Sequence, residues 1–324
     1  MKILVIGSEG FIGGFMVKML QGKGHTVTGM DIRRAEGRKE TYTFISGDLM
    51  DAEGLKKAMA GMDLVLNLAA KHHDFGISRE EFFEINEEGT RRIVQAMTET
   101  GIKKFIFYSS VAVYGDVEEC SNESLPEAPS NDYGESKLAA EKVIRQWAAQ
   151  DPGREVIMIR PTVVFGPHNY ANMYKLINAI YKGTFVLVGK GDNIKSVTYV
   201  ENLVDMTGFV LERLKPGVEV YNYSDYEHLT SAQIIDIICR ALGRKKFRRR
   251  LPLAPVLWVT SVMDLLAKIT RINFPITAKR IKKLNTRTWH GSDKVRALGF
   301  EQKIPLEEGF RRMVEWYLEE KGKK

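Results

Sequence analysis

Near-continuous apolar runs alternate with longer amphipathic segments through the first half of the chain, and this alternation constrains the fold most. Short apolar runs bounded by turn residues predict buried β-strands, and the segments between them have helical spacing. The predicted strands are residues 3–6, 26–31, 43–46, 64–68, 104–109 and 156–160. The predicted helices are residues 13–22, 51–60, 79–101 and 133–149. The pattern therefore predicts an α/β fold with a doubly wound parallel sheet covered on both faces.

The regular alternation ends after Gly166. A helix (173–182) and a short strand (185–188) follow, residues 197–200 are typical of a strand end, and residues 218–223 could rejoin the main sheet. From Thr230 onward the pattern is mostly helical. We therefore expect a larger domain of residues 1–166 with about 197–224, and a smaller C-terminal lobe of residues 167–196 and 225–324.

A glycine turn with the spacing G-x-x-G-x-x-G follows the first predicted strand and opens the first predicted helix. Gly7 permits the tight turn, Gly10 lets the backbone approach a pyrophosphate, and Gly13 lets helix and strand pack closely. The N-terminus of the helix offers N–H groups and the positive end of its dipole to phosphates. The turn therefore predicts a dinucleotide site. We expect the Glu9 side chain to point to solvent, because its charge would repel the phosphates.

An acidic residue, Asp31, ends the second predicted strand, 18 residues past Gly13. A carboxylate at this place bonds the adenosine ribose hydroxyls and rejects a 2′-phosphate, which favours NAD. Ile32, Arg33 and Arg34 follow at once. Because arginines here could instead hold a 2′-phosphate, NADP stays the alternative.

Two further strand ends could contact the cofactor. Asp48 follows the third strand, where its carboxylate could contact adenine or cap the next helix, although Asp51 already suits the cap. Asn67-Leu68-Ala69-Ala70 ends the fourth strand with small side chains. Small residues would let the backbone lie against the cofactor, or they could serve packing alone.

Tyr133 and Lys137 stand four residues apart on a predicted helix and so share one face. A free tyrosine has a pKa of about 10, and a nearby ammonium group lowers that pKa by favouring the phenolate. A phenol tuned in this way can accept a proton from a substrate hydroxyl while hydride leaves the same carbon. Taken alone, the pair could be an exposed helix pair.

Two serines follow the fifth predicted strand, at the edge where open α/β sheets bind ligands. Ser110 could donate a hydrogen bond to the reacting oxygen, with Ser109 beside it. The alternative is an ordinary loop with two serines.

Taken in order, these motifs resemble the extended short-chain dehydrogenase/reductases and, within them, the NAD-dependent epimerase/dehydratase family of nucleotide sugars. The motifs are the glycine turn, Asp31, Asp48, Asn67-Leu-Ala-Ala, Ser110 to Tyr114-Gly115, Tyr133-x-x-x-Lys137 and Arg160-Pro161 to Gly166-Pro167. Further similar segments are Asn86-Glu-Glu-Gly89-Thr90, Val197-Thr-Tyr-Val200-Glu-Asn202 and Asp293-Lys294 to Leu298-Gly299-Phe300. The resemblance covers nearly the whole chain.

The resemblance implies a Rossmann domain with a smaller C-terminal α/β substrate lobe. Tyr133 would be the base, Lys137 its electrostatic support, and Ser110 the group that orients the hydroxyl. The cofactor site would also include Phe11, Ile12, Ile32, Arg33, Asp48, Leu49, Leu68, Ala69, Ala70, Asn86, Ser109, Pro161 and Val163. Helices around residues 85–100 and 133–149 would pair with a second subunit as a four-helix bundle, which makes a homodimer.

The same resemblance narrows the reaction. The dehydratase branch of the family carries Thr-Asp-Glu where this chain has Ser110-Val111-Ala112, so the acid and base that expel water are missing. The reaction implied is 4-epimerisation of a nucleotide sugar, in which the transient ketone turns before hydride returns to its opposite face.

Candidate substrate residues are basic or polar side chains of the second half and of one loop. Those for the diphosphate are Lys195, Arg280 and Arg287, and those for the sugar are His72 and Asn169. Lys195 stands where epimerases usually carry arginine, so a point charge replaces bidentate capture. His72 and Asn169 could equally be loop residues without a role.

Two alternatives stay open. Residues 197–202 and 251–272 also resemble 3β-hydroxysteroid dehydrogenase-like proteins, which implies a lipid or sterol alcohol as substrate. The basic run 244–250 precedes a mostly apolar helical face, and such a pair can dock on anionic lipid. Contact of residues 244–272 with a membrane surface, and then a lipid-linked sugar, competes with ordinary packing on the lobe. A non-catalytic NAD-binding scaffold is the third class.

Composition excludes several other classes. Cys120 and Cys239 cannot form a disulfide framework and lack zinc-site spacing, so we expect no metal. The N-terminal run leads into a glycine turn without a cleavage site, and no apolar run reaches about 18 residues. We therefore expect a cytoplasmic protein, which could be peripheral at the inner face of the membrane.

The net charge of +7 is uneven. Residues 244–324 hold 21 Lys/Arg against 8 Asp/Glu, and the other residues hold 27 against 33. This asymmetry predicts an anionic ligand or surface, or else a solvated basic face. We find no nucleic-acid module or stacking aromatic residues there, so we expect no nucleic-acid partner.

Overall fold

A computed structural model describes residues 1–34, 42–72, 76–245, 247, 249–270 and 277–322. In this part of the chain, seven parallel strands form the central sheet in the order β3-β2-β1-β4-β5-β6-β11. The strands are β1 (Lys2–Ile6), β2 (Thr26–Asp31), β3 (Thr43–Ser46), β4 (Leu64–Asn67), β5 (Lys104–Tyr108), β6 (Glu155–Pro161) and β11 (Gly217–Tyr223). The predicted α/β class and doubly wound parallel sheet are confirmed, and residues 217–223 do rejoin the sheet beside β6.

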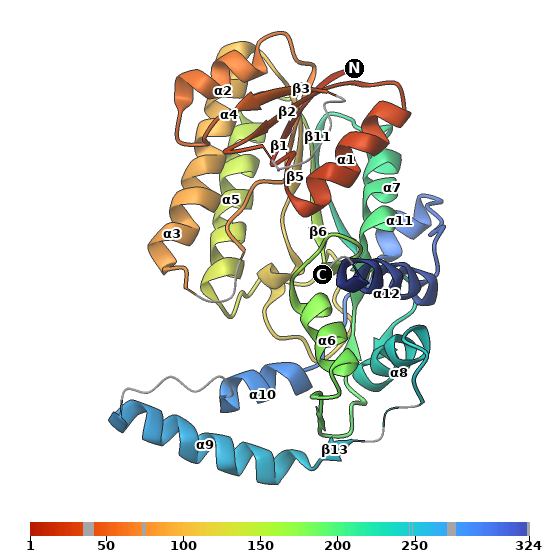
Figure 1. Cartoon of the computed structure of the whole chain (residues 1–324). Helices are drawn as coiled ribbons and strands as arrows, with labels where there is room; N and C mark the ends of the chain where they lie inside the picture. The colour runs from red at the N-terminus through yellow and green to blue at the C-terminus, as the bar shows by residue number, and fades with distance from the viewer. Residues whose placement is uncertain (35–41, 73–75, 246, 248, 271–276, 323–324) are drawn as a thin grey trace.

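Helices cover both faces of this sheet (Figure 1). On one face lie α2 (Ala52–Met59), α4 (Gly89–Thr100) and α5 (Asp132–Ala149); on the other lie α1 (Phe11–Gly22), α7 (Val200–Leu211) and α11 (Asp293–Ala297). Each face has its own apolar core, so the side chains of a central strand are buried on both sides. This double burial is why the strands read as continuous apolar runs rather than alternating ones.

The predicted helix 79–101 is interrupted. It consists of α3 (Arg79–Phe83), a π-helical segment η1 (Glu84–Glu88) and α4. The wider turns of η1 carry Asn86, whose amide donates to Ser136 on α5 and bonds both backbone groups of Lys71. Single π-helical turns inside helices often mark functional sites, and periodicity alone does not reveal them.

Several of the remaining elements build a third apolar core around β10 (Val197–Tyr199), which pairs with β7 (Val163–Phe165). The helices of this part are α6 (Asn172–Tyr181), α8 (Ser231–Ala241), α9 (Leu253–Thr270), α10 (Ala278–Asn285) and α12 (Leu306–Gly322). Two small sheets join β9 (Ile194–Lys195) to β12 (Leu229–Thr230) and β8 (Leu187–Val188) to β13 (Arg250–Leu251). The domain boundaries at residues 166, 197 and 224 stay a prediction.

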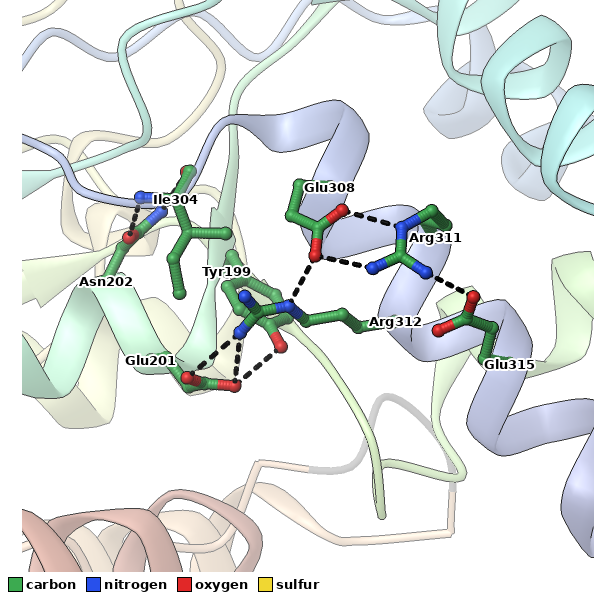
Figure 2. A network of polar contacts seen from close by, with 8 residues as sticks. All are labelled: Tyr199, Glu201, Asn202, Ile304, Glu308, Arg311, Arg312 and Glu315. Atoms are coloured by element: carbon green, nitrogen blue, oxygen red, sulfur yellow. Dashed lines mark hydrogen bonds and ion pairs between the residues drawn. The ribbon is translucent and has the colours of Figure 1, made fainter.

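Polar contacts fix the C-terminal helix α12 to the start of α7 (Figure 2). Arg312 contacts the Glu201 carboxylate at 3.3 Å and donates to Glu308 at 2.7 Å. The Asn202 amide bonds both backbone groups of Ile304, and Tyr199 donates to Glu201. Residues 197–202, which the sequence analysis singled out, therefore have a structural role: they hold α12 in place.

The glycine turn packs tightly against its surroundings. Gly7 has a φ of +82°, and a Cβ on it would lie 2.8 Å from the backbone nitrogen of Ala69. A Cβ on Gly13 would lie 2.7 Å from the carbonyl oxygen of Ser8 and nearer still to that of Gly7. Both positions therefore require glycine. None of the described helices is long and apolar enough to cross a membrane.

Replacing Gly13 with valine should lower the free energy of unfolding by at least about 1–3 kcal/mol, because the new side chain overlaps main-chain atoms that cannot move aside. Urea denaturation measures the change. Gly22→Ala, at the open end of the same helix with nothing within 4 Å, is the matched control and should be neutral or stabilising. Equal effects of the two substitutions would contradict the close packing of Gly13 against the backbone of Gly7 and Ser8.

Candidate active site

The carboxyl ends of β1 and β4 meet where the strand order reverses, the place at which open α/β sheets bind ligands. The turn Gly7–Gly10 leaves β1 here, and Gly10 caps α1 with extended backbone. Leu68 continues the pairing of β4 with β1 by donating to Ile6 at 2.9 Å. Phe11, Ile12 and Gly13 are the first residues of α1, and N–H groups in a first helical turn have no acceptor within the helix. The turn thus presents backbone N–H groups beside β4, an arrangement that suits an anion.

Asp31 lies at the end of β2, next to this turn. Its carboxylate accepts hydrogen bonds from the backbone of Glu9 at 3.1 Å and of Ile32 at 2.8 Å. Burial raises the pKa of Asp31, although these two hydrogen bonds oppose the rise. The carboxylate is thereby fixed in one orientation, with lone pairs left for ribose hydroxyls. Ile32 and Arg33 are exposed beside it.

The expectation for Glu9 is wrong. Its side chain is part-buried and accepts a hydrogen bond from the hydroxyl of Tyr42. Tyr42 lies one residue before β3, so the contact joins the glycine turn to the neighbouring strand. A partner 33 residues away in the chain is not visible from the local pattern that suggested a solvent-directed carboxylate.

Asp48 and Leu49 lie in the turn between β3 and α2. Asp48 is exposed and accepts from the backbone of Met50 at 2.9 Å, while Leu49 is buried. Asp51 caps α2 by accepting from Gly54 at 3.0 Å, as predicted. Contacts of Asp48 and Leu49 with adenine therefore stay a prediction.

Beyond β4 the chain is fixed by side-chain amides. Asn67 accepts from the backbone of Ala69 at 3.0 Å, and Asn86 bonds the backbone of Lys71. Ala69 and Ala70 are half-buried between these two amides. The Asn86 amide is therefore already used by Lys71 and Ser136, and it shapes this loop; its contact with a cofactor stays a prediction.

Tyr133 and Lys137 lie on the first turns of α5, whose start is capped by Asn131. The Tyr133 ring is half-buried, with its centre 6.1 Å from that of Phe82. Lys137 is only 2% exposed, and its ammonium lies 4.3 Å from the centre of the Phe107 ring. Burial lowers the pKa of Lys137 to about 7, while the carboxylate of Glu141 acts in the opposite direction.

The two predicted serines have different surroundings. Ser110 caps a short 3₁₀ turn, η2 (Val111–Tyr114), by accepting from Ala112 at 3.1 Å. Because this bond uses its oxygen as an acceptor, the hydroxyl proton of Ser110 stays free to donate. Ser109 is buried and donates to Glu141 at 2.5 Å. Ser110 is therefore the candidate for substrate, and Ser109 is structural.

A buried ion pair behind these residues was not predicted. Arg160, at the end of β6, donates to both carboxylate oxygens of Glu141 on α5, at 2.8 and 2.5 Å. Arg160 is 1% exposed and Glu141 is 0% exposed. Arg160 also donates to Tyr114 and to Glu127, both at 2.6 Å. The only indication of this pair in the sequence was Glu141 itself, an acidic residue one helical turn beyond Lys137 on the same face of the helix.

The substrate candidates of the second half partly converge. Lys195 on β9 lies opposite Thr288, and Arg287 lies next to it. A cavity of about 400 Å³ is lined by Asp116, Val117, Glu118, Thr286 and Arg287. The segment 116–118 follows η2, so the cavity lies between the loop after Ser110 and the C-terminal part of the chain. Sequence reasoning did not find this loop, because nothing in it resembles a motif.

Lys195 and Arg287, two basic side chains near this cavity, differ in how free they are to bind a diphosphate. Lys195 donates to the carbonyls of Thr286 at 2.6 Å and Lys283 at 3.3 Å. Burial, and then the charge of Lys283, lower the pKa of Lys195 to about 8. Arg287 is exposed; its guanidinium donates to the Glu118 carbonyl at 3.3 Å and lies 5.8 Å from the centre of the Trp289 ring. Arg287 is therefore the better candidate for a diphosphate. The Arg280 side chain lies outside the described part.

The remaining candidates lie in loops and at strand ends. His72 is exposed and contacts the Ala70 carbonyl at 3.3 Å. The Asn169 amide is used within its own loop, by Val164 and Ala171. Pro161 is buried at the end of β6, and Val163 is 52% exposed. Among the described residues, no group of His, Cys, Asp or Glu could hold a metal ion.

Comparison with known proteins identifies the family. Residues 3–223 match the model of the NAD dependent epimerase/dehydratase family. The chain belongs to this family. It is 34% identical, over 97% of its length and 95% of the relative's, to the N-acetyl-alpha-D-glucosaminyl-diphospho-ditrans,octacis-undecaprenol 4-epimerase of Escherichia coli O157:H7. The predicted family and the predicted enzyme class are confirmed.

Solved structures of other proteins share the fold. UDP-glucose 4-epimerase of Thermus thermophilus, in complex with NAD, superposes with a TM-score of 0.77 at 22% identity, covering 98% of this chain and 99% of that one. UDP-glucose 4-epimerase of Thermotoga maritima, with UDP-glucose, gives 0.79 at 22% identity, covering 99% of each chain. NAD as the cofactor of this family member is confirmed.

The residues present fit this cofactor. A Cβ on Gly7 or Gly13 would fill the turn, the helix α1 begins there, and the fixed carboxylate of Asp31 lies beside it. The first turn of α1 holds no acidic side chain. We infer that the turn would hold the pyrophosphate and Asp31 the adenosine ribose, with Lys137 on the nicotinamide ribose.

Glu141→Gln should lower the free energy of unfolding by about 3–5 kcal/mol, because it leaves the buried Arg160 charge half-compensated. Urea denaturation measures this. The matched control is Glu155→Gln, which breaks the more exposed pair with Lys104 at 3.0 Å. The control should cost less than about 1 kcal/mol. A similar small cost for both variants would show that the buried pair does not hold α5.

Lys137→Met should remove a pH dependence of stability. The pKa of Lys137 falls from 10.5 to about 7 on folding, so above pH 7 the unfolded state binds more protons and wild-type stability rises with pH. The variant lacks this rise, and its stability advantage over wild type should shrink between pH 7 and 10. Urea denaturation after removal of nucleotide measures it. Lys142→Met, a substitution at an exposed position on the same helix, should keep the rise. A stability difference between Lys137→Met and wild type that does not change with pH would contradict the effect of burial.

Proposed function

We propose that this chain is an NAD-dependent 4-epimerase that acts on a sugar carried on a diphosphate. The observation that supports it most is the placing of Tyr133 and Lys137 on α5, at the sheet edge that also carries Ser110 and the glycine turn. Val111 and Ala112 offer no acid or base for expelling water. The 34% identical relative from Escherichia coli O157:H7 is itself a 4-epimerase.

In this proposal the reaction begins with removal of a proton from a sugar hydroxyl by Tyr133. Lys137, one helical turn from Tyr133, would favour the phenolate in its ammonium form, and Ser110 would hold the reacting oxygen by hydrogen bonding. When bound, NAD takes up hydride from the same carbon and later gives it back. Between these events the ketone turns in the site, and Tyr133 then returns the proton to the new hydroxyl. Because the sugar regains both the hydride and the proton that it gave up, the reaction needs no outside oxidant.

The diphosphate is the part of the substrate that the charges recognise best. Arg287 is exposed beside the cavity, and Lys195 lies close to it. Both a nucleotide sugar and a sugar on a polyprenyl diphosphate carry this group. The structure from Thermotoga maritima contains UDP-glucose, whereas the Escherichia coli relative is described by a polyprenyl substrate. We therefore propose the sugar diphosphate as the shared substrate class.

The homodimer through residues 85–100 and 133–149 is likewise a proposal. In its support, α4 and α5 lie side by side on one face of the sheet, as a four-helix interface between two subunits requires (Figure 1).

The test is to incubate the protein and NAD with UDP- and dTDP-sugars and, separately, with N-acetylglucosaminyl-diphospho-polyprenol. NMR of the released sugars reads the epimers. Epimer formation without net NADH supports the proposal, and the arm that reacts identifies the carrier. Stoichiometric NADH from a hydroxysteroid would instead support the dehydrogenase alternative. Bound NAD with no turnover would support the scaffold.

Tyr133→Phe should lower the turnover rate about 10²–10⁴-fold, the usual effect of losing a positioned acid–base group. NAD binding should persist, because the ring stays against Phe82 and the glycine turn is unchanged. Turnover assays and NAD titration measure the two effects. Tyr170→Phe, an exposed tyrosine outside the site, is the matched control. Unchanged turnover of Tyr133→Phe would refute the role of the phenol.

A further inference from the structure

One face of α9 and the strand before it is apolar and exposed. The residues of this α9 face are Leu251, Pro252, Ala254, Pro255, Trp258 and Val259. Trp258 is 72% exposed, and Leu251 and Val259 are each 48% exposed. Thr260, on the opposite side of the helix, is 4% exposed, so the helix has a definite inner and outer side. An unburied tryptophan in a continuous apolar patch marks an interaction surface.

The chain segment that contains the α9 face is strongly basic. Residues 240–289 contain 14 Lys/Arg and one acidic residue, Asp264. Lys245, Arg249 and Arg250 are exposed just before the face. Arg249 donates to the Gly183 carbonyl and Arg250 contacts the Lys190 carbonyl, so the run is held against the loops around β8. Charge complementarity therefore selects an anionic partner.

The helix α9 lies at one extremity of the molecule, alongside α10 and away from the central sheet (Figure 1). On α10 itself, Leu284 is 65% exposed, and Lys282 and Lys283 are exposed beside it. The chain leaves α10 at Asn285 and enters the cavity wall at Thr286 and Arg287. A surface that binds the α9 face is thereby connected through one short helix to the proposed diphosphate site.

We propose that the α9 face docks on an anionic lipid bilayer. Tryptophan is favoured at the level of lipid headgroups, and each Lys or Arg near an anionic surface adds about 1 kcal/mol of attraction. An amphipathic helix with basic flanks binds in the plane of such an interface without spanning it. Docking presents the cavity to a sugar diphosphate whose carrier is a membrane lipid. The identification of the substrate as a lipid-linked sugar diphosphate rests on the proposed function. The docking of the α9 face on a bilayer does not.

The experiment is cosedimentation of the purified protein with vesicles of phosphatidylcholine alone or with added phosphatidylglycerol. The wild type should bind the anionic vesicles, and added salt should weaken the binding. Trp258→Glu should lower the partition coefficient at least about tenfold, because it replaces the largest apolar contact with a charge. Leu298→Glu, at a position 44% exposed after α11, is the matched control and should bind as wild type does.

Three results would overturn the docking: no binding of the wild type to anionic vesicles, equal binding of Trp258→Glu, or binding that Leu298→Glu weakens as strongly. Sedimentation velocity of the same variants tests the competing occupant, a second copy of the chain. A dimer that Trp258→Glu dissociates, with vesicle binding unchanged, would also overturn it. Epimerisation assays with a water-soluble and with a polyprenyl-linked sugar diphosphate separate the two proposals: vesicle binding with turnover of neither substrate supports docking and overturns the proposed function. Trp258→Glu should retain any turnover of the water-soluble substrate.

Discussion

The buried pair between Arg160 and Glu141 is the contact on which the candidate site depends. It joins the end of β6 to the middle of α5, one helical turn beyond Lys137 and two beyond Tyr133. Charges removed from water in this way are stabilising only when their hydrogen bonds are complete. Here Ser109, Tyr114 and Glu127 supply the remaining partners. The helix α5, which carries Tyr133 and Lys137, is therefore held to the sheet edge by the same cluster that orders the loop after β5.

That cluster continues towards the substrate lobe. Tyr114 donates to Asn222 on β11 and stacks on His290, which in turn bonds Ser121. The residues that line the cavity, 116–118 and 286–287, lie a few residues along the chain from Tyr114 and His290. A chain of buried polar contacts thus connects α5 to the segment that would hold a diphosphate. Such an arrangement suits an enzyme that must hold a carrier firmly while the sugar ring turns near the phenol.

Much of the fold could be predicted, and the candidate reacting groups could be chosen, because their signals are local. Strands β2 and β3 begin and end where the apolar runs do, and the glycine turn and the Tyr133–Lys137 spacing each lie within one supersecondary unit. The failures involve partners distant in sequence. Tyr42 holds Glu9, and Lys195 bonds carbonyls 88 and 91 residues away. The hydrophobic periodicity of the sequence reveals neither the π-helical turn at Asn86 nor the pairing of Glu141 with Arg160.

Return of the same hydride to the same carbon is the central chemical claim. A sugar diphosphate labelled with deuterium at C4, incubated with the enzyme and NAD in ordinary water, measures it directly by NMR of the epimer. The account predicts that the product keeps its deuterium at C4 and gains no solvent hydrogen there. Loss of the label to water in step with epimer formation would show that the carbon exchanges its hydrogen as a proton, and would contradict the account.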